Sequence, residues 1–313
     1  MSSGYESWPF RPPHARSVDE SARWWEHCHT PAGIESALQD QPFWSVVTGG
    51  TGSGKSLIIE NLERRESKTS FVVRYPPTRW PGAKQCWVPS GNHLSQIMAE
   101  ASISLREFFS ANPGKLAILS KDQRGFLRWV IEKFSGPRSF SRWIDGFGSD
   151  QTDLFHDVVY DDIYPDTTTL KNVRDQIDEL VRLVCKLGYR RLLVIVDLDE
   201  SDLYQPLIWN KDEKPLEHLR SLLRLSDPTR HGGFALVATM PKRAEEKIID
   251  SKKPLDQIKL FHIRWTLDTL REIATAHIRQ AVGKADAEMT DFISESLYHE
   301  MENWLVAEYG EYT

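Results

Sequence analysis

The amino-acid sequence predicts an α/β fold, with a central five-stranded parallel sheet flanked by helices and a small helical segment at the C-terminal end. Three observations lead to this prediction. A glycine-rich loop ending in Lys55-Ser56 joins an apolar strand to a helical pattern. A continuous apolar run over 191–196 is typical of a strand buried on both faces, as in parallel sheets. Further β-rich segments are separated by helical patterns, as expected when crossover helices join parallel strands.

We expect three parts in the chain of 313 residues. Residues 1–40 are an N-terminal arm with short helices, residues 41–266 are the α/β core, and residues 267–313 are a helical segment. Within the core, residues 76–168 form a helical, aromatic-rich insertion. Whether the chain is a fragment that stops inside its last segment is left open.

Composition excludes several classes of protein. A net charge of −6 argues against a chain that coats nucleic acid non-specifically. Cys28, Cys86 and Cys185 are too few and too far apart for a disulfide framework or a zinc site. The sequence shows neither the apolar core of a signal peptide nor an apolar run long enough to span a membrane. We therefore expect a cytoplasmic protein without membrane contact.

The loop over residues 49–56 matches G-x-x-x-x-G-K-[ST] in full and lies between a strand and a helix, as that motif requires. Its glycines allow positive φ, so backbone N–H groups can turn toward phosphate oxygens, where the helix dipole adds positive potential. Lys55 is expected to reach the β- and γ-phosphates, and the Ser56 hydroxyl to bind Mg²⁺. The motif predicts a P-loop NTPase fold, and the residues expected to contact the nucleotide are Gly49, Gly50, Thr51, Gly52, Ser53, Gly54, Lys55, Ser56 and Leu57.

The first half of the core follows from apolar patterns. The first strand is expected over 44–48, the helix after the loop extends to about Arg65, and a second strand over 71–75 stops at two prolines. A helix over 168–187 has one apolar stripe and ends at Gly188.

The second half of the core is predicted in the same way. After the strand that begins at residue 191 we expect a helix over 216–225, a strand over 233–239 and a fifth strand over 260–265. Two helices, 267–282 and 289–307, close the chain. Leu297 is expected in the buried stripe of the second.

The aromatic-rich insertion is expected to contain helices over 92–110 and 121–134. Residues 111–145 hold seven Lys or Arg and three Asp or Glu, which gives a net charge of +4. Two interpretations remain open. These charges either form a solvated surface or contact nucleic acid, because aromatic residues lie between the arginines. The arginines concerned are Arg124, Arg128, Arg138 and Arg142.

Acidic residues follow the apolar run that begins at residue 191. Asp197 ends this strand, and open α/β sheets bind their ligands at the carboxyl ends of the strands. Beside a phosphate-binding loop, an acidic residue in this place is typical of the magnesium side of the site. We therefore expect Ser56 and Asp197 to hold Mg²⁺ together.

The phosphate loop after the first strand, the acidic end of the third and the short helical tail resemble the AAA+ and related STAND ATPases. The resemblance covers residues 40–75 and 168–313. It implies that Thr239, at the end of the fourth strand, is the polar residue called sensor 1, and that 263–273 leads into a helical lid. It further implies ATP and Mg²⁺ as cofactors, and ATP hydrolysis coupled to self-assembly and to remodelling of a DNA or protein partner.

The chain departs from this family in two places. The family's adjacent Asp-Glu pair is replaced by Asp197-Leu198-Asp199-Glu200, so the general base is assigned to Glu200, with Asp199 as the alternative. The chain also reaches Thr313 at about the point where the family's sensor-2 arginine is expected. The candidate catalytic residues are therefore Glu200, Asp199, Lys55 and Thr239.

The resemblance implies a homo-oligomer in which a neighbouring subunit supplies an arginine to each site. Arg224, Arg230 and Arg243 are the candidates. Two functional alternatives stay open: a slowly hydrolysing nucleotide-gated switch, and a kinase for a small molecule, since a phosphate loop does not name the phosphate acceptor. GTP is disfavoured because Asn210-Lys211-Asp212-Glu213 misses the N-K-x-D pattern.

Overall fold

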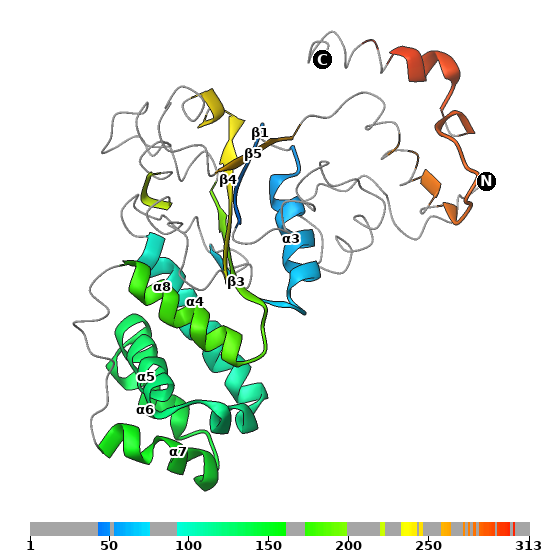
Figure 1. Ribbon diagram of the computed structural model, residues 1–313. Helices are drawn as coiled ribbons and strands as arrows, with labels where there is room; N and C mark the ends of the chain where they lie inside the picture. Colours follow the sequence, from blue (N-terminus) through cyan, green and yellow to red (C-terminus); the bar gives the residue numbers. More distant parts are fainter. Residues whose placement is uncertain are drawn as a thin grey trace.

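A computed structural model describes residues 43–50, 53–75, 93–160, 173–198, 220–222, 233–242, 244–246 and 258–263, and part of 272–303. In these residues, five strands form one sheet in the order β2-β3-β4-β1-β5, and every neighbouring pair is parallel (Figure 1). This confirms the predicted α/β fold with a five-stranded parallel sheet. The strands are β1 (Phe43–Gly49), β2 (Ser70–Tyr75), β3 (Arg191–Asp197), β4 (Phe234–Pro241) and β5 (Lys259–His262).

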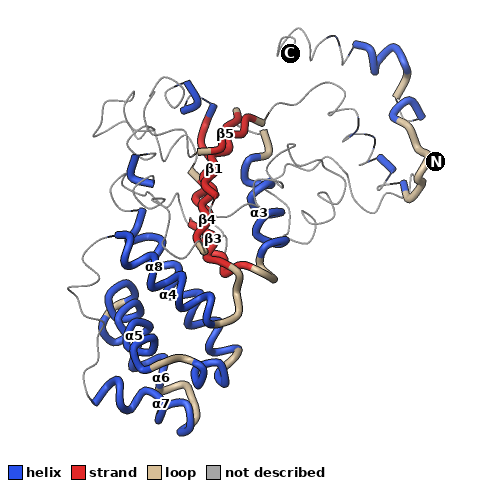
Figure 2. The backbone as a smooth tube through the Cα atoms, in the orientation of Figure 1, coloured by secondary structure: helices blue, strands red, loops and turns tan. Residues whose placement is uncertain are grey.

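Helices cover both faces of the sheet, with α3 (Lys55–Glu66) on one side and α4 (His93–Ala111) and α8 (Val173–Lys186) on the other (Figure 2). Successive side chains of a strand point to opposite faces, so each strand contributes to two separate cores. The smaller core joins the sheet to α3 and contains Val47, Ile58, Ile59, Leu62, Leu193, Ile195 and Val237. The larger core on the other face contains their strand neighbours Val46, Val194, Val196 and Leu236.

The described residues between β2 and β3 are mainly helical, as predicted. The expected helices 92–110 and 121–134 are α4 and α5 (Lys121–Ser135), and α8 lies within the expected helix 168–187. The described residues also contain α6 (Pro137–Ile144), α7 (Ser149–Tyr160) and the 3-10 helix η2 (Pro113–Ile118), which the sequence analysis did not predict. Gly136 adopts φ 106° and Pro137 opens α6, so the residues that suggest a loop mark the boundary between two helices.

The aromatic residues of this helical segment form its core. Trp143 packs edge-on against Phe147 with ring centroids 5.0 Å apart, and Phe140 against Phe155 at 5.4 Å. Trp129 and Phe126, in α5, are also buried. The buried rings cannot stack on nucleic-acid bases, whereas Trp143 and Phe147 are only partly buried.

Two of the four arginines considered for nucleic-acid contact are engaged inside the helical segment. Arg128 is 9% exposed and pairs with Glu132, and Arg124 donates a hydrogen bond to the Leu119 carbonyl. Arg138 and Arg142 are exposed. A contact with nucleic acid here stays a prediction that depends on these two residues.

Two predicted elements near the C-terminal end differ from the structure. The fifth strand ends at His262, three residues before the expected end, and Ile263 already lies outside it. In the segment expected as a helix over 289–307, the 3-10 helix η4 (Met289–Asp291) comes first, and regular helix is described over 295–300. Leu297, expected in a buried stripe, is 47% exposed. The Ser294 hydroxyl accepts a hydrogen bond from the Leu297 N–H, as a helix cap does, so Ser294 starts the helix late.

The remaining predicted elements are described in part or not at all. Residues 220–222 are helical, as expected for the helix over 216–225. The N-terminal arm, residues 1–40, and most of the predicted helix over 267–282 lie outside the described residues. None of the helices that the structure describes is long and apolar enough to cross a membrane.

At the amino end of the sheet, a buried ion pair ties β3 to α3 and β2. The Arg191 side chain is 1% exposed, and it donates through Nη2 to Glu66 Oε2 at 2.7 Å and through Nε to Ser70 Oγ at 3.1 Å. Ser70 donates to the same Glu66 oxygen at 2.8 Å. Burial by itself would raise the pKa of Glu66, but the hydrogen bonds from Arg191 and Ser70 outweigh it, so the pKa is lowered from 4.5.

This ion pair predicts a loss of stability in acid. The folded-state pKa of Glu66 lies below its unfolded value, so its contribution is complete above about pH 4.5 and disappears as the pH falls through the folded-state pKa. The variant Glu66→Gln should unfold more easily at pH 7, and part of the wild-type loss of stability in acid should be absent from it. Urea unfolding at several pH values measures both effects. Equal pH dependence in the two proteins would contradict this role for Glu66.

Candidate functional site

The glycine-rich loop of residues 49–56 connects β1 to α3 at the carboxyl edge of the sheet. Gly54 precedes the first residue of α3 and adopts φ 89°, a conformation that favours glycine. A side chain at Gly49 would place its Cβ 2.4 Å from Ser53 Oγ, so the Ser53 side chain would have to move to admit one. Thr51 and Gly52 lie outside the described residues, as does the side chain of Leu57.

Lys55, the first residue of α3, folds back over the loop. Its Nζ donates hydrogen bonds to the Gly49 carbonyl at 3.0 Å and to the Gly50 carbonyl at 2.9 Å. The Ser53 N–H donates to the same Gly50 carbonyl at 3.2 Å, and the Ile58 N–H to the Gly54 carbonyl at 3.0 Å. The ammonium group therefore lies against the backbone of the glycine-rich loop, which is where the lysine of this motif is expected to meet phosphate.

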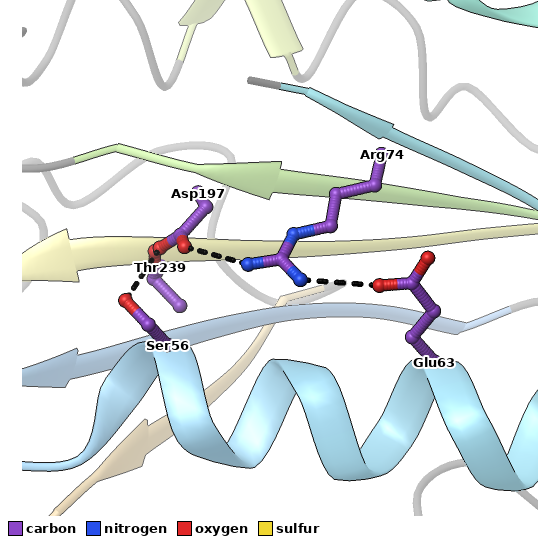
Figure 3. A network of polar contacts seen from close by, with 5 residues as sticks. All are labelled: Ser56, Glu63, Arg74, Asp197 and Thr239. Carbon is purple, nitrogen blue, oxygen red and sulfur yellow. Dashed lines mark hydrogen bonds and ion pairs between the residues drawn. The ribbon is translucent and has the colours of Figure 1, made fainter. Parts of the chain in front are cut away.

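On the face of the sheet that packs against α3, the last residues of β3 and β4 are polar, whereas the preceding ones are apolar. In β3 the residues facing α3 are Leu193, Ile195 and then Asp197, and in β4 Thr239 follows Val237 in the same way. Asp197 and Thr239 lie opposite each other in the register of the two strands. The alternation of the strands therefore carries both side chains to the start of α3, where Ser56 lies (Figure 3).

The carboxylate of Asp197 is held through both of its oxygens. Thr239 Oγ1 donates to Oδ1 at 2.6 Å, and Ser56 Oγ makes a long contact of 3.5 Å with the same oxygen. Arg74 Nη2 pairs with Oδ2 at 3.2 Å. The structure therefore brings together three residues named from the sequence, Ser56, Asp197 and Thr239, and adds Arg74.

Arg74 is a site residue that the sequence analysis missed. It lies in β2 on the α3 face, its side chain is 8% exposed, and its Nη1 pairs with Glu63 Oε2 at 3.1 Å (Figure 3). The available signal was a charged residue inside a mainly apolar strand. Side chains alternate between the two faces of a strand, so Arg74 lies on the same face as Val72, toward α3.

Glu60 adds a further carboxylate to this cluster. Burial raises its pKa, and the negative charges of Asp197 and Glu63 raise it further, whereas the positive charge of Arg74 acts in the opposite direction. Among the described residues, Glu60, Glu63 and Asp197 thus share the field of Arg74. Arg64 also lowers the pKa of Glu60, so positive and negative charges lie close together along this side of α3.

The donor atoms near the start of α3 fit Mg²⁺. Ser56 Oγ and Asp197 Oδ1 are oxygen donors at 3.5 Å from each other, and Mg²⁺ is held by one or two such protein ligands together with phosphate oxygens and water. In the described part of the chain, no group of three or more His, Cys, Asp or Glu side chains is arranged to hold a metal ion. If Mg²⁺ binds here, Ser56 and Asp197 would supply two of its oxygen ligands.

Several predicted functional residues lie outside the described residues. They are the two candidates for the general base, Asp199 and Glu200, and the three candidates for an arginine supplied to a neighbouring subunit, Arg224, Arg230 and Arg243. Their assignments stay predictions.

A second polar cluster lies at the same edge on the opposite face of the sheet. Thr48, the residue before the glycine-rich loop, is fully buried and has its Oγ1 3.1 Å from both Glu245 Oε2 and His262 Nδ1. Glu245 and His262 also pair with each other, and the Ile263 N–H donates to the Thr48 carbonyl at 2.9 Å. These contacts attach the end of β5 to the strand residue that precedes the glycine-rich loop.

No protein-family model matches this sequence, and no curated protein is significantly similar to it.

Proposed function

We propose that this protein binds ATP with Mg²⁺ at the loop of residues 49–56 and hydrolyses it. One observation supports this most strongly: Asp197, at the end of a central strand, contacts Ser56, the last residue of the phosphate-loop motif. These residues are 141 positions apart in the sequence. A glycine-rich turn with an exposed lysine would not need an acidic residue from another strand beside its serine.

Each residue of the site has a role in this proposal. The loop N–H groups and Lys55 bind the phosphates, and Ser56 with Asp197 holds the metal. Bound Mg²⁺ would neutralise negative charge on the phosphates during transfer. Thr239 orients Asp197, because its hydroxyl donates to Oδ1 at 2.6 Å and leaves Oδ2 to Arg74.

The hydrolytic step needs a group that orients the attacking water. Glu200 is our first candidate and Asp199 the second, because both follow Asp197 closely in the chain. Glu200→Gln should keep nucleotide binding and slow turnover, and Asp199→Asn should leave turnover near that of the wild type. Measuring nucleotide affinity and turnover separately distinguishes the two candidates, and a fast Glu200→Gln with a slow Asp199→Asn would exchange their roles.

We further propose that nucleotide drives self-association, with an arginine of one subunit completing the site of the next. This step is supported by the AAA+ and STAND resemblance, and the partner remodelled by the assembly would be DNA or protein. Such an arginine is worth about 10³–10⁵ in rate. Turnover per subunit should therefore rise with protein concentration.

Mixing experiments test the shared site. A variant of Arg224, Arg230 or Arg243 that has lost turnover should regain it when mixed with Lys55→Ala, because the second variant contributes an intact arginine. Turnover that stays constant with concentration, without recovery in any mixture, would mean that the protein acts as a monomer. A slow rate throughout, with tight nucleotide binding, would favour the nucleotide-gated switch instead.

A further inference from the structure

Arg74 places a fixed positive charge beside the carboxylate proposed to bind Mg²⁺. The side chain is 8% exposed, and its guanidinium divides its contacts, with Nη2 on Asp197 and Nη1 on Glu63 (Figure 3). Neither contact is bidentate, whereas arginine forms its strongest ion pairs through two parallel hydrogen bonds to one carboxylate. Arg74 is therefore bound to both carboxylates, and a small movement would favour one over the other.

The two carboxylates differ in their surroundings. The side chain of Asp197 is 17% exposed and receives Thr239 and Ser56 on Oδ1, whereas that of Glu63 is 34% exposed. Ser56, Glu60 and Glu63 follow one another at intervals of four and three positions in α3, so they lie along one side of that helix. Glu63 is the acceptor farther from Ser56 along this side.

A divalent cation at Ser56 and Asp197 would compete with Arg74 for the same carboxylate. Like charges repel, and the repulsion is strong where the groups are shielded from water. The guanidinium thus lowers the affinity of Asp197 for a metal ion. An arginine buried without any carboxylate would be costly, and Glu63 removes that cost because it already holds the other end of the guanidinium.

We propose that Arg74 is a positioning residue that occupies Asp197 in the nucleotide-free protein and restrains its binding of divalent cations. Glu63 is the carboxylate that retains Arg74 when a cation arrives. The inference rests on the proposed function, in which Asp197 is a metal ligand. Its consequence is that the site takes up Mg²⁺ efficiently only when nucleotide phosphates add their own negative charge.

Mn²⁺ serves as the probe because it prefers oxygen ligands, as Mg²⁺ does. Its binding to the nucleotide-free protein is measured from the loss of the electron paramagnetic resonance signal of free Mn²⁺. Arg74→Gln should bind Mn²⁺ about five- to tenfold more tightly than the wild type, because a unit positive charge beside the site is gone. Thr239 still orients Asp197 in this variant. Arg74→Lys, which keeps the charge, should remain within about twofold of the wild type.

Glu63→Gln supplies the opposite change. Of the two carboxylates that Arg74 contacts, only Asp197 then remains charged, so Arg74 should hold Asp197 more firmly and Mn²⁺ binding should weaken by about two- to threefold. The effect is modest because Glu63 is partly exposed. If Arg74 had only a structural role, both Arg74→Gln and Glu63→Gln would have a lower unfolding temperature than the wild type. Their Mn²⁺ affinities would then not change in opposite directions. If Arg74→Gln does not fold, Glu63→Gln and Arg74→Lys still give the comparison.

The inference is overturned if Arg74→Gln binds Mn²⁺ as the wild type does or more weakly, or if Glu63→Gln binds it no more weakly than the wild type.

The same variants are then titrated with ATP in Mg²⁺ and in EDTA. A wild type that binds Mn²⁺ with the expected order of variants but binds no ATP would contradict the proposed function and support the inference. If the wild type binds ATP with Mg²⁺ but the variants do not show the expected order of Mn²⁺ affinities, the proposed function is supported and the role of Arg74 is contradicted.

Discussion

Replacing Lys55 by alanine is expected to reduce the affinity for ATP by about 100-fold or more and to abolish turnover. The expected size follows from the loss of a charged hydrogen-bond donor, worth about 1.5–3 kcal/mol for each such bond. In the nucleotide-free protein Lys55 donates to the loop carbonyls of Gly49 and Gly50, and its side chain is half-buried. These contacts lie within the loop itself, so the rest of the fold should survive the change.

Lys68→Ala is the matched control for this prediction. Lys68 is an exposed lysine just beyond the end of α3, outside the phosphate loop. Isothermal titration with ATP and a thermal melt of both variants separate loss of the site from loss of the fold. Equal ATP affinity in Lys55→Ala and Lys68→Ala would show that the loop does not bind phosphate.

Replacing Asp197 is expected to have the second large effect. Asp197→Ala should remove the Mg²⁺ dependence of nucleotide binding and reduce turnover by about 100-fold or more, since a metal ligand and its charge are lost. It should also destabilise the fold by about 1–3 kcal/mol, because the Thr239 hydroxyl loses its acceptor. The loss stays below that of an unpaired buried charge, since Arg74 keeps Glu63 as a partner.

Asp197→Asn separates the two consequences. An asparagine can still accept a hydrogen bond from Thr239 and should retain more stability than alanine, but it lacks the charge that binds Mg²⁺. Nucleotide affinity with and without Mg²⁺, measured beside urea unfolding, resolves these effects. If Asp197→Asn hydrolyses ATP at the wild-type rate, the acidic end of β3 is not the metal side of the site.

Much of the core could be predicted because its signals are local. The buried run of β3 and the fully buried β4 are continuous apolar segments, and the glycine-rich turn has a fixed spacing. The junction of α5 and α6 was not predictable in this way, since Gly136 and Pro137 suggest a loop although they end one helix and begin the next.

The site was predictable only where a motif names its residues. Ser56 belongs to the motif and Asp197 ends an obvious strand, so both could be chosen from the sequence. Arg74 and Glu63 could not, because their importance comes from the order of the strands, which places β2 beside β3 and turns Arg74 toward α3. The ion pair between Arg191 and Glu66 joins residues far apart in the chain and has no local signal either.

We propose that ATP binds at the loop of residues 49–56 with Mg²⁺ held between Ser56 and Asp197. Isothermal titration of the wild-type protein with ATP, in Mg²⁺ and again in EDTA, tests it most directly. We expect saturable binding of one ATP per chain that is weakened in EDTA, and much weaker binding of GTP. The absence of saturable ATP binding at physiological concentrations, or binding that is indifferent to both Mg²⁺ and the Lys55→Ala change, would contradict it.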